Sequence, residues 1–420
     1  MTRNQCFAYS WHVDKEEEEC TSIRMYGLNQ ENKTVCLHIE GFTPYVYIEL
    51  NAPGVKWTVS KAQLLGDCLD RQITTSQDPM AQFQKPLKKV LVWKKKLYGT
   101  HLDFDTGERK VFPYLFCNFA HPKYIKSLYY KLGKPLRVPG LGLVKLKIHE
   151  SDASPILQLI CCRKLQSAGW ISFKGRQVKE VAQETRCDEE YRVKYTNLEL
   201  GNCTAFAKPK IMGFDIEVNS SNPKTMPNAN RPDDRIFQIS CIFSREGDTE
   251  DQYEKHILSL GDPDQETTGD DVIIHRYPTE AYLLEGFVKL INDESPNIIA
   301  GYNILGFDIP YMIKRAKREC CIYSFSLQGF HKTATAKEKI IKWSSSAFRN
   351  QEFEFLDAEG RVYVDLLPLV QRDYKFNNYK LKTVSTHFLG HTKEDLSVQG
   401  IFKCYRVGMK TDSRTGMHTN

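Results

Sequence analysis

Residues 212–218 (MGFDIEV) decide the fold class, because they predict a β-strand that carries two acids. Successive side chains of a strand point to opposite faces, so Asp215 and Glu217 share one face and their apolar neighbours share the other. Two bare carboxylates about 4 Å apart repel each other by roughly 4 kcal/mol at an effective dielectric constant of about 20. A divalent cation removes that cost, and oxygen ligands suit Mg²⁺ or Mn²⁺. A solvent-facing acidic strand explains the same pattern, so this motif alone leaves both interpretations open.

A third acid follows a later predicted strand. Residues 298–300 indicate a buried strand, and the loop 301–307 (GYNILGF) brings Asp308 to the start of a predicted helix whose first turn contains Pro310. Asp308 is also a good helix N-cap, which is the plain structural alternative. Two acids on one strand and a third at a later strand-to-helix turn are what a metal-dependent phosphoryl-transfer site on an α/β sheet requires. Together the three acids favour such a site.

The two halves of the chain differ in their pattern. Before about residue 205, short β-branched and aromatic runs separated by Gly and Pro predict a strand-rich domain. Beyond it, strand-like segments alternate with helices, one of which is capped by Thr279 and runs to about Asn292. We therefore expect an α/β protein in which a mixed α+β domain (residues 1–205) precedes a second domain (residues 206–420).

Two features of the first half each allow two interpretations. Lysines surround the apolar run 90–93 (VLVW), which predicts a basic edge strand or hairpin that is either a solvated face or a nucleic-acid contact. Residues 121–132 predict a helix whose apolar stripe is more typical of a core than of a stacking platform. The lysines are Lys85, Lys88, Lys89, Lys94, Lys95 and Lys96. The stripe consists of Tyr124, Ile125, Leu128, Tyr129 and Leu132.

Composition bounds the class of protein. With 420 residues, 41% of them hydrophobic and 26% charged, the chain is long enough for two or three domains and has no membrane-spanning apolar run. A net charge of +6, from 58 basic and 52 acidic residues, only slightly favours a nucleic-acid partner. The 13 cysteines lack spaced metal-binding pairs, and residues 1–13 lack a secretory signal. We expect reduced thiols and a cytosolic or nuclear protein that is not secreted.

Two of these segments resemble the first two exonuclease motifs of B-family DNA polymerases, namely residues 214–217 (FDIE) and 302–311 (YNILGFDIPY). Residues 41–48 (GFTPYVYI), 168–170 (AGW) and 364–389 are similar to the delta-like members of eukaryotes and large DNA viruses. The resemblance thus extends over nearly the whole chain. It implies the N-terminal domain of such a polymerase, followed by a 3′-to-5′ proofreading exonuclease with an RNase H-like fold of the DEDD class.

The resemblance also implies roles for single residues. Asp215, Glu217 and Asp308 would be the catalytic acids and would hold two Mg²⁺ (or Mn²⁺) ions at the 3′ end of single-stranded DNA, where water attacks the terminal phosphodiester. Asn303 and Phe307 match positions that contact or position the strand end; a loop-fixing amide and a core aromatic are the structural alternatives.

The implied partners follow from the same family. They are DNA, as a single-stranded 3′ end and as primer-template, a sliding clamp or other accessory subunits, and the palm, fingers and thumb of a polymerase. Those polymerase parts would come from a missing C-terminal portion or a partner chain. The implied location is the nucleus or a cytoplasmic viral replication site, without a membrane.

The sequence departs from the family pattern at the last metal ligand. The family's third exonuclease motif is a Tyr followed four residues later by an Asp, and no Tyr after Asp308 has an Asp at that spacing. Asp365 is a tempting fourth acid, although a structural role is the better interpretation. Three hypotheses remain: the proofreading portion of a replicative polymerase, a stand-alone DEDD nuclease with Asp395 or Asp412 as its last ligand, and an inactive nucleic-acid-binding or docking module.

Overall fold

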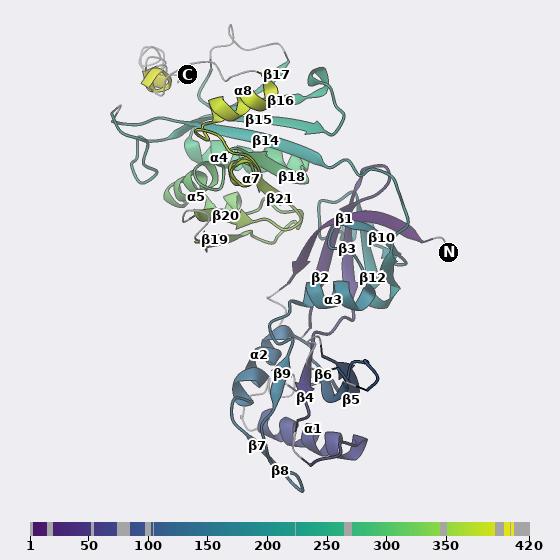
Figure 1. Cartoon of the computed structure of the whole chain (residues 1–420). Helices are drawn as coiled ribbons and strands as arrows, with labels where there is room; N and C mark the ends of the chain where they lie inside the picture. The colour runs from purple at the N-terminus through teal and green to yellow at the C-terminus, as the bar shows by residue number, and fades with distance from the viewer. Residues whose placement is uncertain are drawn as a thin grey trace. The chain divides into compact units, whose positions relative to one another are not determined.

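The computed structural model describes residues 3–14, 20–51, 54–73, 85–96, 102–103, 105–222, 224–263, 271–344, 351–390, 399–403 and 405–406. The chain forms two compact units (Figure 1). Unit 1 contains Met1–Asn29, Val35–Val178 and Glu189–Thr204, and unit 2 contains Gln30–Thr34, Lys179–Asp188 and Ala205–Asn420. No helix in the described part of the chain is long and apolar enough to cross a bilayer. The domain boundary between residues 205 and 206 stays a prediction.

Unit 1 contains a seven-stranded sheet in the order β11-β12-β3-β2-β1-β10-β13. Helix α3 (Pro155–Arg163) packs on it, and its first turn is fixed by Ser154, whose hydroxyl accepts a hydrogen bond from the Leu157 N–H at 3.1 Å. β2 and β10 are buried along their whole length, so they form the centre of this core. The strands are β1 (Asn4–Val13), β2 (Ile23–Leu28), β3 (Thr34–Glu40), β10 (Gly169–Phe173), β11 (Arg176–Gln177), β12 (Glu189–Lys194) and β13 (Leu198–Leu200).

A second sheet of unit 1 is fully antiparallel, in the order β5-β6-β4-β9. Helices α1 (Val59–Ile73) and α2 (Pro122–Lys131) share a hydrophobic core with one of its faces. The lysine-rich run forms β5 at the sheet edge, which confirms the predicted basic edge strand. The strands are β4 (Tyr45–Glu49), β5 (Lys88–Lys95), β6 (Val111–Asn118) and β9 (Lys147–His149), with a small two-stranded sheet of β7 (Leu136–Val138) and β8 (Gly142–Val144) beside them.

The apolar stripe of α2 is a core stripe, as predicted, with one exception. Tyr124, Ile125, Leu128 and Leu132 are buried, and they pack into the core under the second sheet. Tyr129 is 54% exposed. The prediction of a core position is wrong for Tyr129. This residue lies at the margin of the apolar stripe, and in the structure that margin faces the solvent.

Unit 2 is built on a six-stranded sheet in the order β17-β16-β15-β14-β18-β21. β14 is central and pairs antiparallel with β15 and parallel with β18, and β21 continues the sheet parallel to β18. The strands are β14 (Lys210–Val218), β15 (Ile236–Arg245), β16 (Glu254–Leu260), β17 (Val272–Tyr277), β18 (Ile298–Gly301) and β21 (Val362–Asp365). The strand-and-helix alternation predicted for this half is confirmed.

Helices cover the sheet of unit 2 (Figure 1). In α4 (Glu280–Glu294), the Thr279 hydroxyl accepts a hydrogen bond from the Tyr282 N–H at 3.4 Å, so the predicted helix cap is confirmed. The remaining elements are α5 (Asp308–Arg318), α6 (Ile322–Phe325), α7 (Leu366–Asp373), α8 (Leu381–Leu389) and the antiparallel hairpin of β19 (Lys337–Trp343) and β20 (Gln351–Asp357).

A buried ion pair ties α5 to α4. Arg315 is fully buried, and its Nε donates a hydrogen bond to Glu280 at 2.8 Å. The guanidinium also donates to the backbone carbonyls of Ala229, at 3.1 Å, and Arg231, at 2.7 Å. Glu280 in turn accepts a hydrogen bond from the Ile236 N–H at 2.9 Å. These contacts fix the loop before β15 against α5, close to the acid-bearing strand.

Candidate active site

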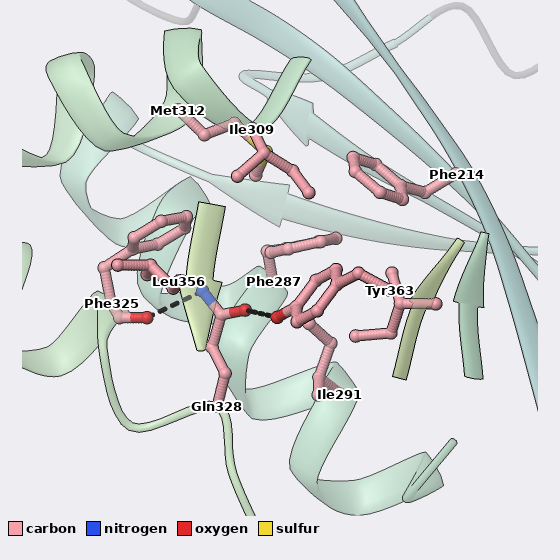
Figure 2. Close-up of a pocket in the computed structure, with 10 residues that line it drawn as sticks. Phe214, Phe287, Ile291, Ile309, Met312, Phe325, Gln328, Leu356 and Tyr363 are labelled. Atoms are coloured by element: carbon pink, nitrogen blue, oxygen red, sulfur yellow. Dashed lines mark hydrogen bonds between the residues drawn. The ribbon is translucent and has the colours of Figure 1, made fainter. Parts of the chain in front are cut away.

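The structure places Asp215 and Glu217 on one face of β14, as their spacing predicted. Asp215 is exposed and Glu217 is half-buried, whereas Phe214 and Ile216 are buried on the opposite face. Figure 2 shows Phe214 and the α5 residue Ile309 pointing toward the same apolar cavity, whose volume is only about 10 Å³. This interior is a packed core with no room for a ligand. It holds the acid-bearing segments of β14 and α5 in fixed positions.

Asp308 is turned toward β14 and does not cap its own helix. The N-cap position of α5 is occupied by Phe307, and its side chain makes no capping hydrogen bond. The carboxylate Oδ1 of Asp308 accepts a hydrogen bond from the backbone N–H of Ile216 at 3.3 Å. Ile216 lies between Asp215 and Glu217, so the structure brings the third acid to the strand that carries the first two. The N-cap alternative is therefore wrong.

Burial and the charge of Asp215 both destabilise the ionised form of Asp308. Only 3% of Asp308 is exposed, and burial together with the charge of Asp215 raises its pKa from 3.8 to about 7. The charge of Asp365 adds to this rise, and the hydrogen bond from Ile216 partly opposes it. A cation between the carboxylates would remove the repulsion, because it favours the ionised form of every acid around it.

Asp365 has a structural role. Its carboxylate accepts hydrogen bonds from the backbone N–H groups of Asn303 at 2.8 Å, Leu305 at 3.0 Å and Leu367 at 3.0 Å. It is therefore the N-cap of α7, and it also fixes the loop that leads to Asp308. This agrees with the interpretation that the sequence favoured for Asp365. The sequence contained no signal for the two bonds to the loop, because they join segments about 60 residues apart.

Asn303 and Phe307 occupy different places. Asn303 has a left-handed backbone (φ 63°), and its carbonyl accepts hydrogen bonds from the N–H groups of Gly306 at 3.1 Å and Phe307 at 3.0 Å. Phe307 packs partly against the core of unit 2. It also lines an open hollow of about 390 Å³ between the start of α5 and residues 226–231. The structure thus gives Asn303 a loop-fixing position, and it brings Phe307 to the hollow beside residues 226–231.

A second charged group lies at the other end of β14. Ligand atoms of Glu254, His256 and Glu294 lie within 4.8 Å of one another. Within the described part of the chain, the ligand atoms of Asp215, Glu217 and Asp308 do not all lie that close together. Lys210 Nζ lies 2.7 Å from Glu254 and 2.6 Å from Glu294, so an ammonium group already balances these carboxylates. Lys210 begins β14 five residues before Asp215, about 17 Å along a strand. Sequence spacing does not reveal this group, because its members come from two separate elements, β16 and α4.

The two alternative last ligands, Asp395 and Asp412, lie outside the described residues. Their roles therefore stay predictions.

The fold and the acid-bearing strand define a nuclease-like α/β domain, with a central strand flanked by one antiparallel and one parallel neighbour. Residues 146–384 match the family model of the exonuclease domain of DNA polymerase family B. This match covers more than half of the chain. The chain therefore belongs to DNA polymerase family B and carries its exonuclease domain, with the RNase H-like fold that the sequence resemblance implied.

Similar proteins are viral and eukaryotic DNA polymerases. The chain is 41% identical to DNA polymerase 120R of Invertebrate iridescent virus 3, over 98% of this chain and 36% of that protein. It is 27% identical to the DNA polymerase delta catalytic subunit of Arabidopsis thaliana, over 89% of this chain and 33% of that protein. The chain spans about a third of the length of these relatives.

A solved structure supports the fold. The family B DNA polymerase from the hyperthermophilic archaeon Pyrobaculum calidifontis superposes with a TM-score of 0.62 at 16% identity, over 98% of this chain and 43% of that chain. Exonuclease domains of this family are metal-dependent, and carboxylates gather in unit 2. The expected family, fold class and exonuclease domain are thus confirmed.

Proposed function

We propose that this chain supplies the 3′-to-5′ proofreading exonuclease of a replicative DNA-directed DNA polymerase. The observation that carries the proposal is the contact between Asp308 and the backbone of β14, which adds a buried third carboxylate to the strand that bears Asp215 and Glu217. Family membership supports the reaction class, and the three acids are the residues to which we assign it.

The donor set fits a divalent metal. All three side chains offer carboxylate oxygens, the ligands that Mg²⁺ and Mn²⁺ prefer, and the raised pKa of Asp308 marks a place where a cation would be stabilising. We assign Asp215, Glu217 and Asp308 as the ligands of two Mg²⁺ ions. When bound, such ions supply charge neutralisation and water activation at the terminal phosphodiester.

Other residues position the substrate in this proposal. Phe307 borders the hollow beside residues 226–231, where its ring would contact the 3′-terminal nucleotide of a single strand. Asn303 and Asp365 keep the loop before Asp308 in one conformation, so they act through the acid and not on DNA. The further partners in this proposal are primer-template DNA, the polymerase domains that the longer relatives contain and a sliding clamp, at a nuclear or viral replication site.

Hydrolysis of a 5′-labelled single strand tests the assignment. The protein, assayed with Mg²⁺ and with Mn²⁺, should shorten the strand from its 3′ end. Asp215→Ala should lower the rate about 100-fold or more, because it removes a ligand of the ions that would neutralise charge at the reacting phosphate. Strand binding, measured separately by fluorescence anisotropy, should change much less than the rate.

A matched control is Asp293→Asn, which removes an exposed acid on α4 that pairs with Lys289. This variant should keep the full rate. Degradation that continues unchanged in Asp215→Ala would refute the assignment of the acids. Binding without hydrolysis, at equal strength in EDTA, would instead identify an inactive nucleic-acid-binding module.

A further inference from the structure

The second sheet of unit 1 has one face that its helices do not cover. Its elements follow the order β4-α1-β5-β6-α2-β9 along the chain, and the sheet order is β5-β6-β4-β9. This is a β-α-β-β-α-β arrangement whose first and third strands lie at the centre of the sheet. Val46, Ile48, Leu115 and Cys117 point from these two strands into the core with α1 and α2. Because side chains alternate along a strand, the intervening residues of β4 and β6 point to the opposite face of the sheet.

Aromatic rings occupy the centre of that opposite face. Tyr47 pairs with Phe116 across β4 and β6, and their ring centroids lie 5.4 Å apart. The ring of Tyr114 lies 6.2 Å from Tyr47 and 5.7 Å from His149 of β9. Tyr47 and Phe116 are half-buried, whereas Tyr114 is buried. Tyr45, whose ring lies 5.6 Å from that of Tyr47 and 5.3 Å from that of Phe116, packs against the core under the first sheet and closes that end of the face. We call Tyr47, Phe112, Tyr114 and Phe116 the aromatic face.

Lysine side chains lie over or beside this aromatic face. Lys94 Nζ lies 5.6 Å from the centroid of the Tyr47 ring, and Lys96 Nζ lies 4.4 Å from that of Phe112. Lys88 of β5 and Lys147 of β9 lie on the outer strands, and the strand register places both on the same side of the sheet as the aromatic face. The acid Glu49 has its charge matched there by Lys96, at 2.6 Å, and by His149, at 2.9 Å. A second acid, Glu150, lies close enough for its charge to act on Tyr47 and Lys94, and Lys88, Lys94 and Lys147 outnumber it, so the rim is positive.

We propose that the aromatic face binds single-stranded nucleic acid, with bases stacked on Tyr47 and Phe116 and phosphates held by Lys94 and its neighbours. Four-stranded sheets with aromatic side chains on their two central strands bind unpaired bases by stacking, which every base permits. A lysine that lies over a ring can move to a phosphate when a base takes its place, because its long side chain is exposed. Duplex bases are already stacked and cannot reach the rings.

This site does not depend on the exonuclease proposal. It contains none of the acids of β14 or α5, and stacking and phosphate contacts require no metal ion. It also assigns a role to the basic strand β5, for which the sequence left a solvated face and a nucleic-acid contact as alternatives. Binding at the aromatic face and hydrolysis at the acids can therefore be tested separately.

Fluorescence anisotropy with a labelled oligothymidylate, in EDTA and at low salt, tests the proposal. Tyr47→Leu and Phe116→Leu should each weaken binding about tenfold, the loss expected for one base stack, while the circular dichroism and thermal unfolding stay close to those of the unchanged protein. Lys94→Gln should weaken binding and reduce the slope of log affinity against log salt by about 0.7, the value for one phosphate contact to a single strand.

Tyr130→Leu is the matched control, because Tyr130 is an 81% exposed tyrosine on α2, which packs against the other side of the sheet. It should leave the affinity unchanged. Photo-crosslinking of a bromodeoxyuridine-containing strand should label peptides from β4 and β6. Oligouridylate in place of oligothymidylate then shows whether RNA or DNA is the preferred single strand.

The proposal would be overturned if the double variant Tyr47→Leu/Phe116→Leu remained folded and bound the oligothymidylate with unchanged affinity. Cross-links confined to unit 2 would overturn it as well. Equal affinity for a duplex of the same length would also contradict it, because base stacking on the rings requires unpaired bases. Tighter binding of oligouridylate would support it with RNA as the ligand.

Discussion

The acid-bearing face of β14 and the aromatic face of β4 and β6 use the same strand alternation in opposite ways. In both, one set of side chains forms a core and the alternate set is available for function. On β14 the functional set is negatively charged, and burial together with the charge of Asp215 raises the pKa of Asp308 to about 7. On β4 and β6 the rings contact one another favourably, with centroids 5.4 Å apart for Tyr47 and Phe116.

The two sets of side chains therefore have opposite effects on the stability of the folded chain. Ionised acids close together destabilise the fold until a cation binds, so the stability of unit 2 should depend on pH and on divalent ions. Packed rings, edge to face for Tyr47 and Tyr114 and tilted for Tyr47 and Phe116, are stabilising without a ligand. The stability of unit 1 should therefore be insensitive to divalent ions.

The largest expected effect concerns the buried charges that hold unit 2 together. Arg315→Ala should lower the free energy of unfolding by about 3–5 kcal/mol, because it leaves Glu280 as an uncompensated buried charge and removes donors from three backbone carbonyls. Chemical denaturation followed by tryptophan fluorescence measures the change. Amide hydrogen exchange should show the loss of protection in unit 2 and not in unit 1.

Arg318→Ala is the control for this change. Arg318 is exposed and donates one hydrogen bond, to the carbonyl of Asn230. Its loss should cost less than about 1 kcal/mol. A similar loss of stability in both variants would show that the buried ion pair is not what holds the loop before β15.

Asp365→Ala should cause the next largest loss of stability. The variant leaves three backbone N–H groups without their acceptor, which should cost about 2–3 kcal/mol. Amide exchange at Asn303, Leu305 and Leu367 should accelerate in the native state. Asp365→Asn, which keeps one acceptor oxygen, should lose less. Unchanged exchange at these amides would contradict the positioning role of Asp365.

Asp308→Asn should stabilise the protein at neutral and alkaline pH. The folded-state pKa of Asp308 is raised from 3.8 to about 7, so the folded state holds the proton more tightly than the unfolded state does. The stability associated with this group is thus fully present below about pH 4 and is lost as the pH rises to about 7. Removing the charge should gain about 2 kcal/mol at about pH 8 and less than half of that at about pH 5.

Thermal unfolding in EDTA at both pH values measures this gain, with Asp293→Asn as an exposed-acid control that should show none. Added Mg²⁺ should stabilise the unchanged protein more than Asp308→Asn, so the difference between them should shrink. A gain that is equal at both pH values would show that ionisation of the buried Asp308 carboxyl is not its cause.

Much of the local structure could be predicted from the sequence. The spacing of Asp215 and Glu217 placed both on one strand face, and the Thr279 cap and apolar periodicity located α4. These features depend on neighbouring residues, which the sequence displays directly. The helix start at Asp308 was predicted for the same reason, with Pro310 in its first turn.

What escaped prediction depends on contacts between distant segments. The turn of Asp308 toward Ile216 follows from the parallel pairing of β14 with β18, which sequence spacing does not reveal. The bonds from the loop to Asp365 require β21 to lie next to β18. The aromatic face needs the register of β4 and β6, strands more than 60 residues apart, so the sequence showed only its lysine-rich edge.

The smallest expected effects come from one helix cap in each unit. Ser154→Ala removes the cap of α3 in unit 1, and Thr279→Ala removes the cap of α4 in unit 2. Each should cost about 1 kcal/mol, because one backbone N–H loses its acceptor. Since neither cap is charged, both losses should be the same between about pH 5 and pH 8 and with or without Mg²⁺. If the Thr279→Ala loss changed with Mg²⁺, the ion dependence of unit 2 would extend beyond its acids. The difference in ion dependence would then be a property of the two units and not of the two faces.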